Sequence, residues 1–330
     1  MDKIYEQKIE KLILSYDKLY LYSADPGASA VLKPLHSIAQ RKRKFVNWFV
    51  EGWAKGANLP ASVCLEADNF RMPQFASSSR VAMFMGQQVE FDRAYNRLSQ
   101  FKESGFETIF ISDHWKEINK SFKLSDNHKL ILPDLFLVPD ELAYNIQKKS
   151  LEQLGASKMQ ISKILRRFVH LGLINSIQKI ESLNIADEKL LKDKYEIYDR
   201  ERVIVMMLDC ILPEEKKQIG FDWRTSLQLA IQHFSLNEPD AQLLVKPHPK
   251  QSRLDVVNFV LAYSSNKKIK VVEEKDPEPF VLIANEVWGI TSILLVLALK
   301  VDKPIKSFMP NRTELGKRES NEHIEPFVIT

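Results

Sequence analysis

The chain has 330 residues, which is enough for two domains of ordinary size that each bury a core. Hydrophobic residues make up 45% and charged residues 27%, with 10 Gly and 15 Pro, a composition that excludes disordered and fibrous proteins. The formal net charge of +4 is too small to indicate a nucleic-acid partner by itself. The longest apolar run, residues 290–299, has about half the length of a membrane span.

The N-terminal segment, residues 1–23, mixes charges throughout and has neither a continuous apolar core nor a small-residue cleavage site, so it does not resemble a signal peptide. The two cysteines, Cys64 and Cys210, fit reduced thiols better than a disulfide framework. We therefore expect a cytoplasmic protein.

Strands alternate with helices in the first half of the chain. Strands are predicted at 18–25, 44–52, 79–87 and 106–115, helices at 27–42 and 90–105, and a strand followed by a helix within 130–155. A cluster of four basic residues, Arg41, Lys42, Arg43 and Lys44, follows the first helix. This cluster indicates either a solvated helix end or a surface attracted to a phosphate-rich acceptor or to the inner face of an anionic membrane.

The second half repeats this alternation. Strands are predicted at 201–210, 241–249, 268–274, 285–291 and 303–308, and helices at 222–235, 252–264 and 292–301. Such alternation is typical of parallel sheets with helices on both faces. We expect an α/β protein with two Rossmann-like domains facing across a cleft: an acceptor-side domain at 1–175, a linker at 176–200 and a nucleotide-donor domain at 201–330.

The segment 243–252, LLVKPHPKQS, places Lys246 and His248 at the end of a predicted strand, with a proline after each. Ligands of parallel sheets gather at the carboxyl ends of strands. Lys meets a phosphate as a point charge, and His meets it as a hydrogen-bond donor. The pattern therefore indicates a phosphate site or, alternatively, a turn whose His is structural.

A second segment ends another strand of the same predicted sheet. Gly289 is followed by Thr291 and Ser292 at the start of an apolar helix, where hydroxyls and unpaired amides attract anions. Helix capping by Thr or Ser is the alternative. Together the two segments would hold the phosphates of a nucleotide from two sides.

The segments Val245–Ser252 and Val287–Ala298 resemble the C-terminal half of GT-B-type glycosyl- and glycerophosphotransferases of bacterial capsule, lipopolysaccharide and teichoic-acid synthesis. Those families hold the donor nucleotide with a His-Pro motif and a Ser/Thr motif. The resemblance implies donor contacts for His248, Pro249, Thr291 and Ser292. It departs from the family pattern at Val296 and Leu297, where many related enzymes have a Glu that reaches the ribose.

Three N-terminal segments, at 22–35, 111–115 and 132–143, also resemble proteins of capsule and lipopolysaccharide gene clusters. Asp25, at a strand end, could be the general base that activates an acceptor hydroxyl, with Gly27 allowing close approach, or it could open a helix in an ordinary Asp-Pro-Gly turn. Asp113 and His114 end another strand and are acceptor-side candidates, with capping and packing as the alternative. Asp25 and His248 are the candidates for catalysis.

The leading hypothesis is transfer of a sugar, or a sugar-like group, from a nucleotide donor to a glycan or lipid-linked acceptor. None of the 7 His has a metal-ligand spacing with Cys or carboxylates, so no metal is predicted, and no cofactor beyond the nucleotide-sugar substrate. The alternatives are a sugar-nucleotide epimerase or hydrolase, a scaffold with a degenerate site, and a DNA-binding regulator. The last rests on 157–174, where Arg166 and Arg167 could belong to a helix-turn-helix.

Overall fold

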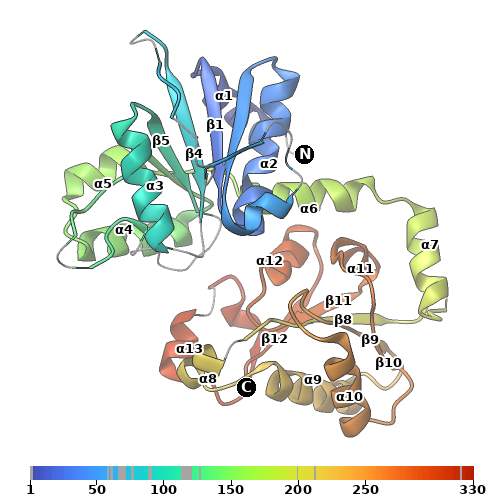
Figure 1. Ribbon diagram of the computed structural model, residues 1–330. Helices are drawn as coiled ribbons and strands as arrows, with labels where there is room; N and C mark the ends of the chain where they lie inside the picture. Colours follow the sequence, from blue (N-terminus) through green and yellow to red (C-terminus); the bar gives the residue numbers. More distant parts are fainter. Residues whose placement is uncertain are drawn as a thin grey trace. The chain divides into compact units, whose positions relative to one another are not determined.

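The computed structural model describes residues 3–57, 59, 62–65, 72–75, 78–87, 91–112, 121–125, 128–198, 200–211, 213–319 and 322–330. They form two compact units, which we call unit 1 (Met1–Asn175) and unit 2 (Ser176–Thr330). Each unit is built on a parallel β-sheet covered by helices (Figure 1). The expectation of two Rossmann-like α/β regions is therefore confirmed.

The sheet of unit 1 has the strand order β3-β2-β1-β4-β5-β6-β7, and every pairing in it is parallel. Its strands are β1 (Lys18–Ser23), β2 (Phe45–Val50), β3 (Ser62–Cys64), β4 (Val81–Gly86), β5 (Glu107–Ile111), β6 (Leu135–Val138) and β7 (Leu165–Arg167). The short strands β3 and β7 form its two edges.

Helices cover both faces of this sheet, because successive side chains of a strand point to opposite faces. In β1, Leu19 and Leu21 pack into a core under helices α1 (Lys3–Leu14) and α2 (Pro26–Arg41). Tyr20 and Tyr22 pack into the core on the other face. That face lies under α3 (Phe91–Glu103), α4 (Glu141–Gln153) and α5 (Lys158–Ile164).

The sheet of unit 2 has the order β10-β9-β8-β11-β12-β13, again with only parallel pairings. Its strands are β8 (Val203–Met207), β9 (Gln242–Lys246), β10 (Ile269–Val271), β11 (Glu286–Gly289), β12 (Ile305–Phe308) and β13 (Val328–Ile329). Every residue of β8 is buried, as its continuous apolar sequence predicts for a central strand.

The helices of unit 2 are mostly the crossovers that parallel pairing requires. They are α8 (Pro213–Ile219), α9 (Trp223–Asn237), α10 (Arg253–Tyr263), α11 (Glu278–Ile283), α12 (Ile293–Lys300) and α13 (Glu314–Glu319). Two further helices, α6 (Leu171–Ser182) and α7 (Ile185–Lys194), cover most of the stretch expected to be a linker, and α7 packs on α11.

The structure does not support the helix-turn-helix interpretation of residues 157–174. Arg166 and Arg167 lie in β7, which pairs with β6 through the register Phe136 to Leu165 and Val138 to Arg167. A recognition helix would have to carry these arginines on a helical face. The DNA-binding hypothesis therefore loses the feature on which it rested.

Candidate functional site

The strand order of unit 2 reverses between β8 and β11, which is the position where doubly wound sheets bind ligands, outside the carboxyl ends of their strands. Asp209 follows β8 and Thr291 follows β11. The backbone N–H and the hydroxyl of Thr291 both donate to Asp209 Oδ2, at 2.7 and 3.0 Å. One carboxylate thus joins the two strand ends at the reversal point.

The His-Pro loop is attached to the same residue. His248 N–H donates to Gln251 Oε1 at 2.8 Å, and Gln251 Nε2 donates to the carbonyl of Asp209 at 3.1 Å. The loop closes through Gln251 N–H to the carbonyl of His248, at 2.8 Å. The structure therefore brings both predicted donor motifs to one edge of the sheet, with Asp209 and Gln251 between them.

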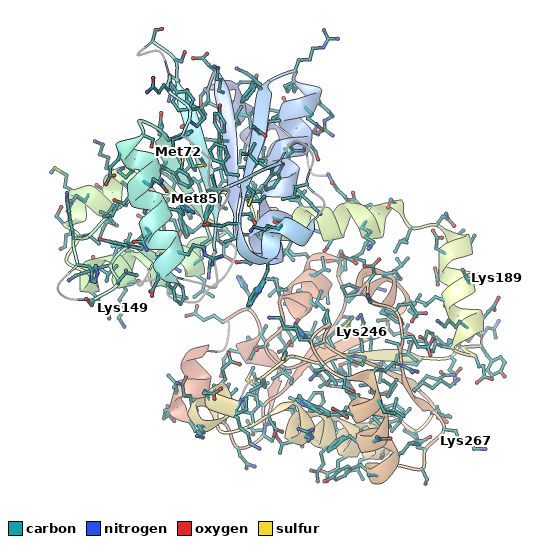
Figure 2. All side chains as sticks on the ribbon, viewed as in Figure 1. Met72, Met85, Lys149, Lys189, Lys246 and Lys267 are labelled. Atoms are coloured by element: carbon teal, nitrogen blue, oxygen red, sulfur yellow. The ribbon has the colours of Figure 1, made fainter. Side chains whose placement is uncertain are left out.

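Lys246 is the last residue of β9 and is buried, with 5% of its surface exposed (Figure 2). Within the described part of the chain, no group accepts a hydrogen bond from its Nζ or forms an ion pair with it. Burial lowers the pKa of Lys246, and the carboxylates of Glu274, Asp276 and Glu278 oppose this shift from a distance. The Nζ keeps some contact with solvent and has no close acceptor among the described residues, so an anion at this edge would meet a cation that is not already paired.

Those three carboxylates already have closer cations. Glu274 lies 2.5 Å from Lys194 Nζ and also accepts a hydrogen bond from Tyr195. Lys179 Nζ lies 2.7 Å from Asp276 and 3.3 Å from Glu278. The acidic loop after β10 is thus bound to helices α6 and α7 and not to the cation at the end of β9.

His248 is half-buried, and burial lowers its pKa, assisted by the positive charges of Lys250 and Lys246. The backbone N–H of Lys250 lies 3.1 Å from His248 Nδ1, so this nitrogen accepts a hydrogen bond and carries no proton. The proton of the neutral ring then lies on Nε2. His248 is therefore a neutral imidazole with a donor available on Nε2.

The remaining donor candidates have structural partners. Ser292 is the N-cap of α12 and accepts a hydrogen bond from the N–H of Leu294, at 3.3 Å. A Cβ on Gly289 would lie 3.1 Å from side-chain atoms of Leu295, so a larger residue there would require Leu295 to shift by a few tenths of an ångström. Pro249 is exposed, while Leu297 is fully buried in the core of unit 2.

In unit 1, Asp25 is the N-cap of α2 and follows β1 at the corresponding reversal of strand order, between β1 and β4. Its Oδ1 accepts from the N–H of Ala28 at 2.8 Å, and a Cβ on Gly27 would lie 3.2 Å from the same oxygen. The turn therefore opens a helix, and the carboxylate is 7% exposed. Asp113 and His114 lie outside the described residues.

Unit 1 also holds a buried ion pair that the sequence analysis did not identify. Glu51 follows β2, is 2% exposed, and accepts from Arg97 Nε at 3.0 Å and from Arg97 Nη2 at 2.6 Å. The Tyr22 hydroxyl donates to the same carboxylate, and burial together with Glu51 raises the pKa of Tyr22. In the sequence, Glu51 stands directly after the apolar residues of β2, and this position is the signal that could have identified the pair.

Side chains of the basic cluster at 41–44 contact other residues of unit 1. Arg41 forms an ion pair with Glu6, Lys42 Nζ lies 2.8 Å from Glu10, and Lys44 Nζ donates to a backbone carbonyl at 2.7 Å. These contacts favour the interpretation of the cluster as a helix end fastened to α1.

No group of three or more His, Cys, Asp or Glu side chains in the described residues could hold a metal ion. None of their helices is both long enough and apolar enough to cross a membrane.

No protein-family model matches the chain, and no curated protein matches its sequence. Solved structures do match its fold. A Staphylococcus aureus MnaA–UDP co-structure matches with a TM-score of 0.55 and 12% identity, over 95% of this chain and 84% of that one. A Listeria monocytogenes structure described as a putative UDP-N-acetylglucosamine 2-epimerase matches with a TM-score of 0.51 and 10% identity, over 91% and 80% of the two chains. Both have the GT-B fold, so the fold that the motif resemblance implied is confirmed for this chain.

Proposed function

We propose that unit 2 binds the phosphates of a nucleotide sugar and that the protein transfers the sugar to a glycan or lipid-linked acceptor of surface-polysaccharide synthesis. The observation that carries the proposal is Lys246, a largely buried residue at the end of β9, directly before the His-Pro segment, whose ammonium has no close partner among the described residues. A phosphate oxygen at this edge would supply the missing negative charge. The UDP of the S. aureus MnaA co-structure supports a nucleotide ligand for the same fold.

Each residue of the edge has a role in this proposal. Lys246 neutralises a phosphate, His248 donates from Nε2, and the positive end of the α12 dipole favours an anion. Asp209 acts indirectly, because it fixes Thr291 and, through Gln251, the His-Pro loop. The proposal requires no metal ion and no cofactor other than the nucleotide-sugar substrate.

The acceptor side is assigned to unit 1. Asp25 is buried at the carboxyl end of β1, where a general base could receive the proton of an acceptor hydroxyl. The same carboxylate caps α2 by accepting a hydrogen bond from the backbone N–H of Ala28. We propose Asp25 as the base and His248 as a donor-side catalytic group that stabilises the leaving phosphate.

The test is nucleotide-sugar binding by Lys246→Met, measured by calorimetry after a thermal-shift screen of CMP, CDP, UDP and ADP sugars. Loss of one charge-assisted contact weakens binding by roughly ten- to a hundredfold. The matched control is Lys267→Met, which removes an equal charge from an exposed position of unit 2. Equal binding by both variants would contradict the proposed site.

Product analysis of the same nucleotide sugar separates the related functions. A sugar attached to an acceptor supports the transferase. An altered sugar configuration without transfer would identify an epimerase, and free sugar with free nucleotide would identify a hydrolase. Binding without turnover across a broad acceptor panel would identify a scaffold.

A further inference from the structure

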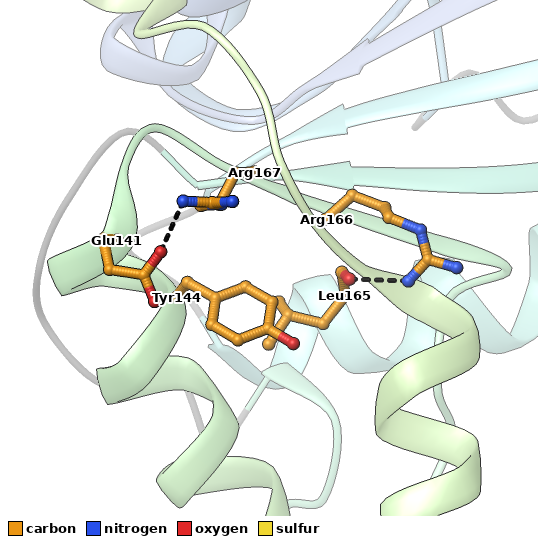
Figure 3. Close-up of a pocket in the computed structure, with 5 residues that line it drawn as sticks. All are labelled: Glu141, Tyr144, Leu165, Arg166 and Arg167. Atoms are coloured by element: carbon orange, nitrogen blue, oxygen red, sulfur yellow. Dashed lines mark hydrogen bonds and ion pairs between the residues drawn. The ribbon is translucent and has the colours of Figure 1, made fainter.

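A depression of about 450 Å³ opens beside the last strand of unit 1, far along the sheet from β1 (Figure 3). It is lined by Glu141, Tyr144, Leu165, Arg166 and Arg167. Neither the donor motifs nor Asp25 contribute to it. We refer to it as the arginine pocket.

The arginine pocket lies at the carboxyl edge of the unit 1 sheet. Arg167 is the last residue of β7 and pairs in register with Val138, the last residue of β6. Asp140 then caps α4, whose first residue is Glu141. All strands of this sheet are parallel, so the pocket lies at the same edge as Asp25, which follows β1.

The two guanidinium groups of the arginine pocket have N–H donors that bind no acceptor among the described residues. Arg167 Nη1 lies 2.5 Å from Glu141 Oε2, but these side chains are 62% and 60% exposed, and an ion pair exposed to this degree holds weakly. Arg166 Nη1 donates to the carbonyl of Leu165 at 2.8 Å and to that of Ser162. The other nitrogens of both guanidinium groups have no partner among the described residues.

Tyr144 adds a neutral donor. Its ring lies between Glu141 and Leu165, and its hydroxyl has no hydrogen-bond partner among the side chains and carbonyls that the structure describes (Figure 3). Two Arg against one Glu give the lining a net charge of +1.

We propose that the arginine pocket binds a phosphate group carried by the acceptor glycan. Guanidinium groups match the oxygens of a phosphate in pairs, and the weak pair with Glu141 can be exchanged for the ligand. The identification of the ligand as acceptor rests on the proposed function, in which unit 1 receives the acceptor. The phosphate site itself does not depend on it.

The experiment uses the full-length Lys246→Met variant, so that the donor edge does not contribute, and glucose 6-phosphate as the probe, with glucose as the uncharged comparison. We expect the phosphate sugar to bind and glucose not to bind. Adding Arg166→Gln and Arg167→Gln weakens binding by about ten- to a hundredfold. The matched control adds Lys158→Gln and Lys163→Gln, two equal charge changes at exposed positions outside the pocket, and shifts binding by less than about twofold, as screened surface charges do.

Several results would overturn the arginine pocket as a phosphate site. They are no binding of glucose 6-phosphate, equal weakening by the lysine control, and binding that survives the arginine changes. Binding only to phosphatidylglycerol vesicles, with no binding of the soluble phosphate sugar, would assign the surface to a membrane instead. Unaltered nucleotide binding by Lys246→Met would refute the donor site of unit 2 and leave the result for unit 1 standing.

Discussion

Units 1 and 2 place their first four strands in the same order, with the third, second, first and fourth strands side by side, yet their carboxyl edges hold different charges. In unit 1 the buried carboxylate of Glu51 is neutralised by Arg97. In unit 2 the ammonium of Lys246, a residue that is 5% exposed, has no such partner among the described residues. A shared topology therefore provides the same kind of edge in both units, and the unpaired cation of unit 2 favours the proposed phosphate site beside the reversal of its strand order.

The largest expected effect is on turnover in Asp25→Asn, a substitution that distinguishes a capping role of Asp25 from a role as general base. Asn caps helices as well as Asp does, so Asp25→Asn should keep α2 and the stability of unit 1. If Asp25 is the acceptor's base, turnover falls by roughly two to four orders of magnitude while donor binding stays. Turnover and nucleotide-sugar affinity measured side by side check this. A parallel loss of donor binding would mean that Asp25 is structural or a donor ligand.

The buried pair of unit 1 gives the next effect. Glu51→Gln leaves the partly buried Arg97 without its carboxylate, and breaking such a pair lowers the free energy of unfolding by about 3 kcal/mol. Urea unfolding measures this loss. The control, Glu141→Gln, breaks the exposed pair with Arg167 and should change stability little. Similar losses in the two variants would show that burial does not set the strength of these pairs.

In unit 2, we expect the removal of a charge to raise the free energy of unfolding instead of lowering it. Because burial lowers the pKa of Lys246, the folded state resists its charge, and Lys246→Met should raise the free energy of unfolding at neutral pH. As pH rises through the lowered pKa toward the ordinary value of about 10.4, Lys246 loses its proton and no longer destabilises the folded wild-type protein. The free energies of unfolding of the two proteins should therefore become equal there. Unfolding curves at several pH values measure this convergence.

Lys303 provides a contrast within unit 2. Burial lowers its pKa too, but its Nζ donates to the carbonyls of Leu282 and Ala284, at 2.9 and 2.7 Å. Lys303→Met should therefore lower the free energy of unfolding, by about 1 to 2 kcal/mol. A loss of stability in Lys246→Met as well would mean that the cation at the end of β9 has a structural partner.

The smallest expected effect is the pH dependence of nucleotide-sugar affinity, which we attribute to His248. Its pKa is lowered in the free protein, and a bound phosphate would raise it, so binding takes up a proton and affinity should increase as pH falls from about 8 to below about 6.5. We expect roughly a three- to tenfold increase, with one pKa unit corresponding to tenfold. A nucleotide sugar is the suitable ligand because its phosphates do not titrate in this range. A pH profile unchanged in His248→Gln would remove His248 from the site.

The sequence determined the architecture because its signals are local. A continuous apolar segment such as Val203–Met207 predicts a buried strand, and Asp25 before a Pro predicts a helix start; both lie where the sequence placed them. The edge strand β7 was missed because edge strands lack such a pattern, and its last two residues are exposed arginines. Arg166 and Arg167 consequently fitted a helix as well as a strand.

The tertiary structure alone decided which side chains meet. Thr291 binds Asp209 from 82 residues away, and Arg97 binds Glu51 from 46 residues away. No local pattern contains such pairs, because they depend on the order in which the strands assemble. Lys246 illustrates both contributions: its sequence puts a cation at a strand end, and only the surrounding fold leaves this residue 5% exposed with no close partner among the described residues. The physical reason is that propensity acts between near neighbours, whereas desolvation and charge pairing depend on every element that packs around a site.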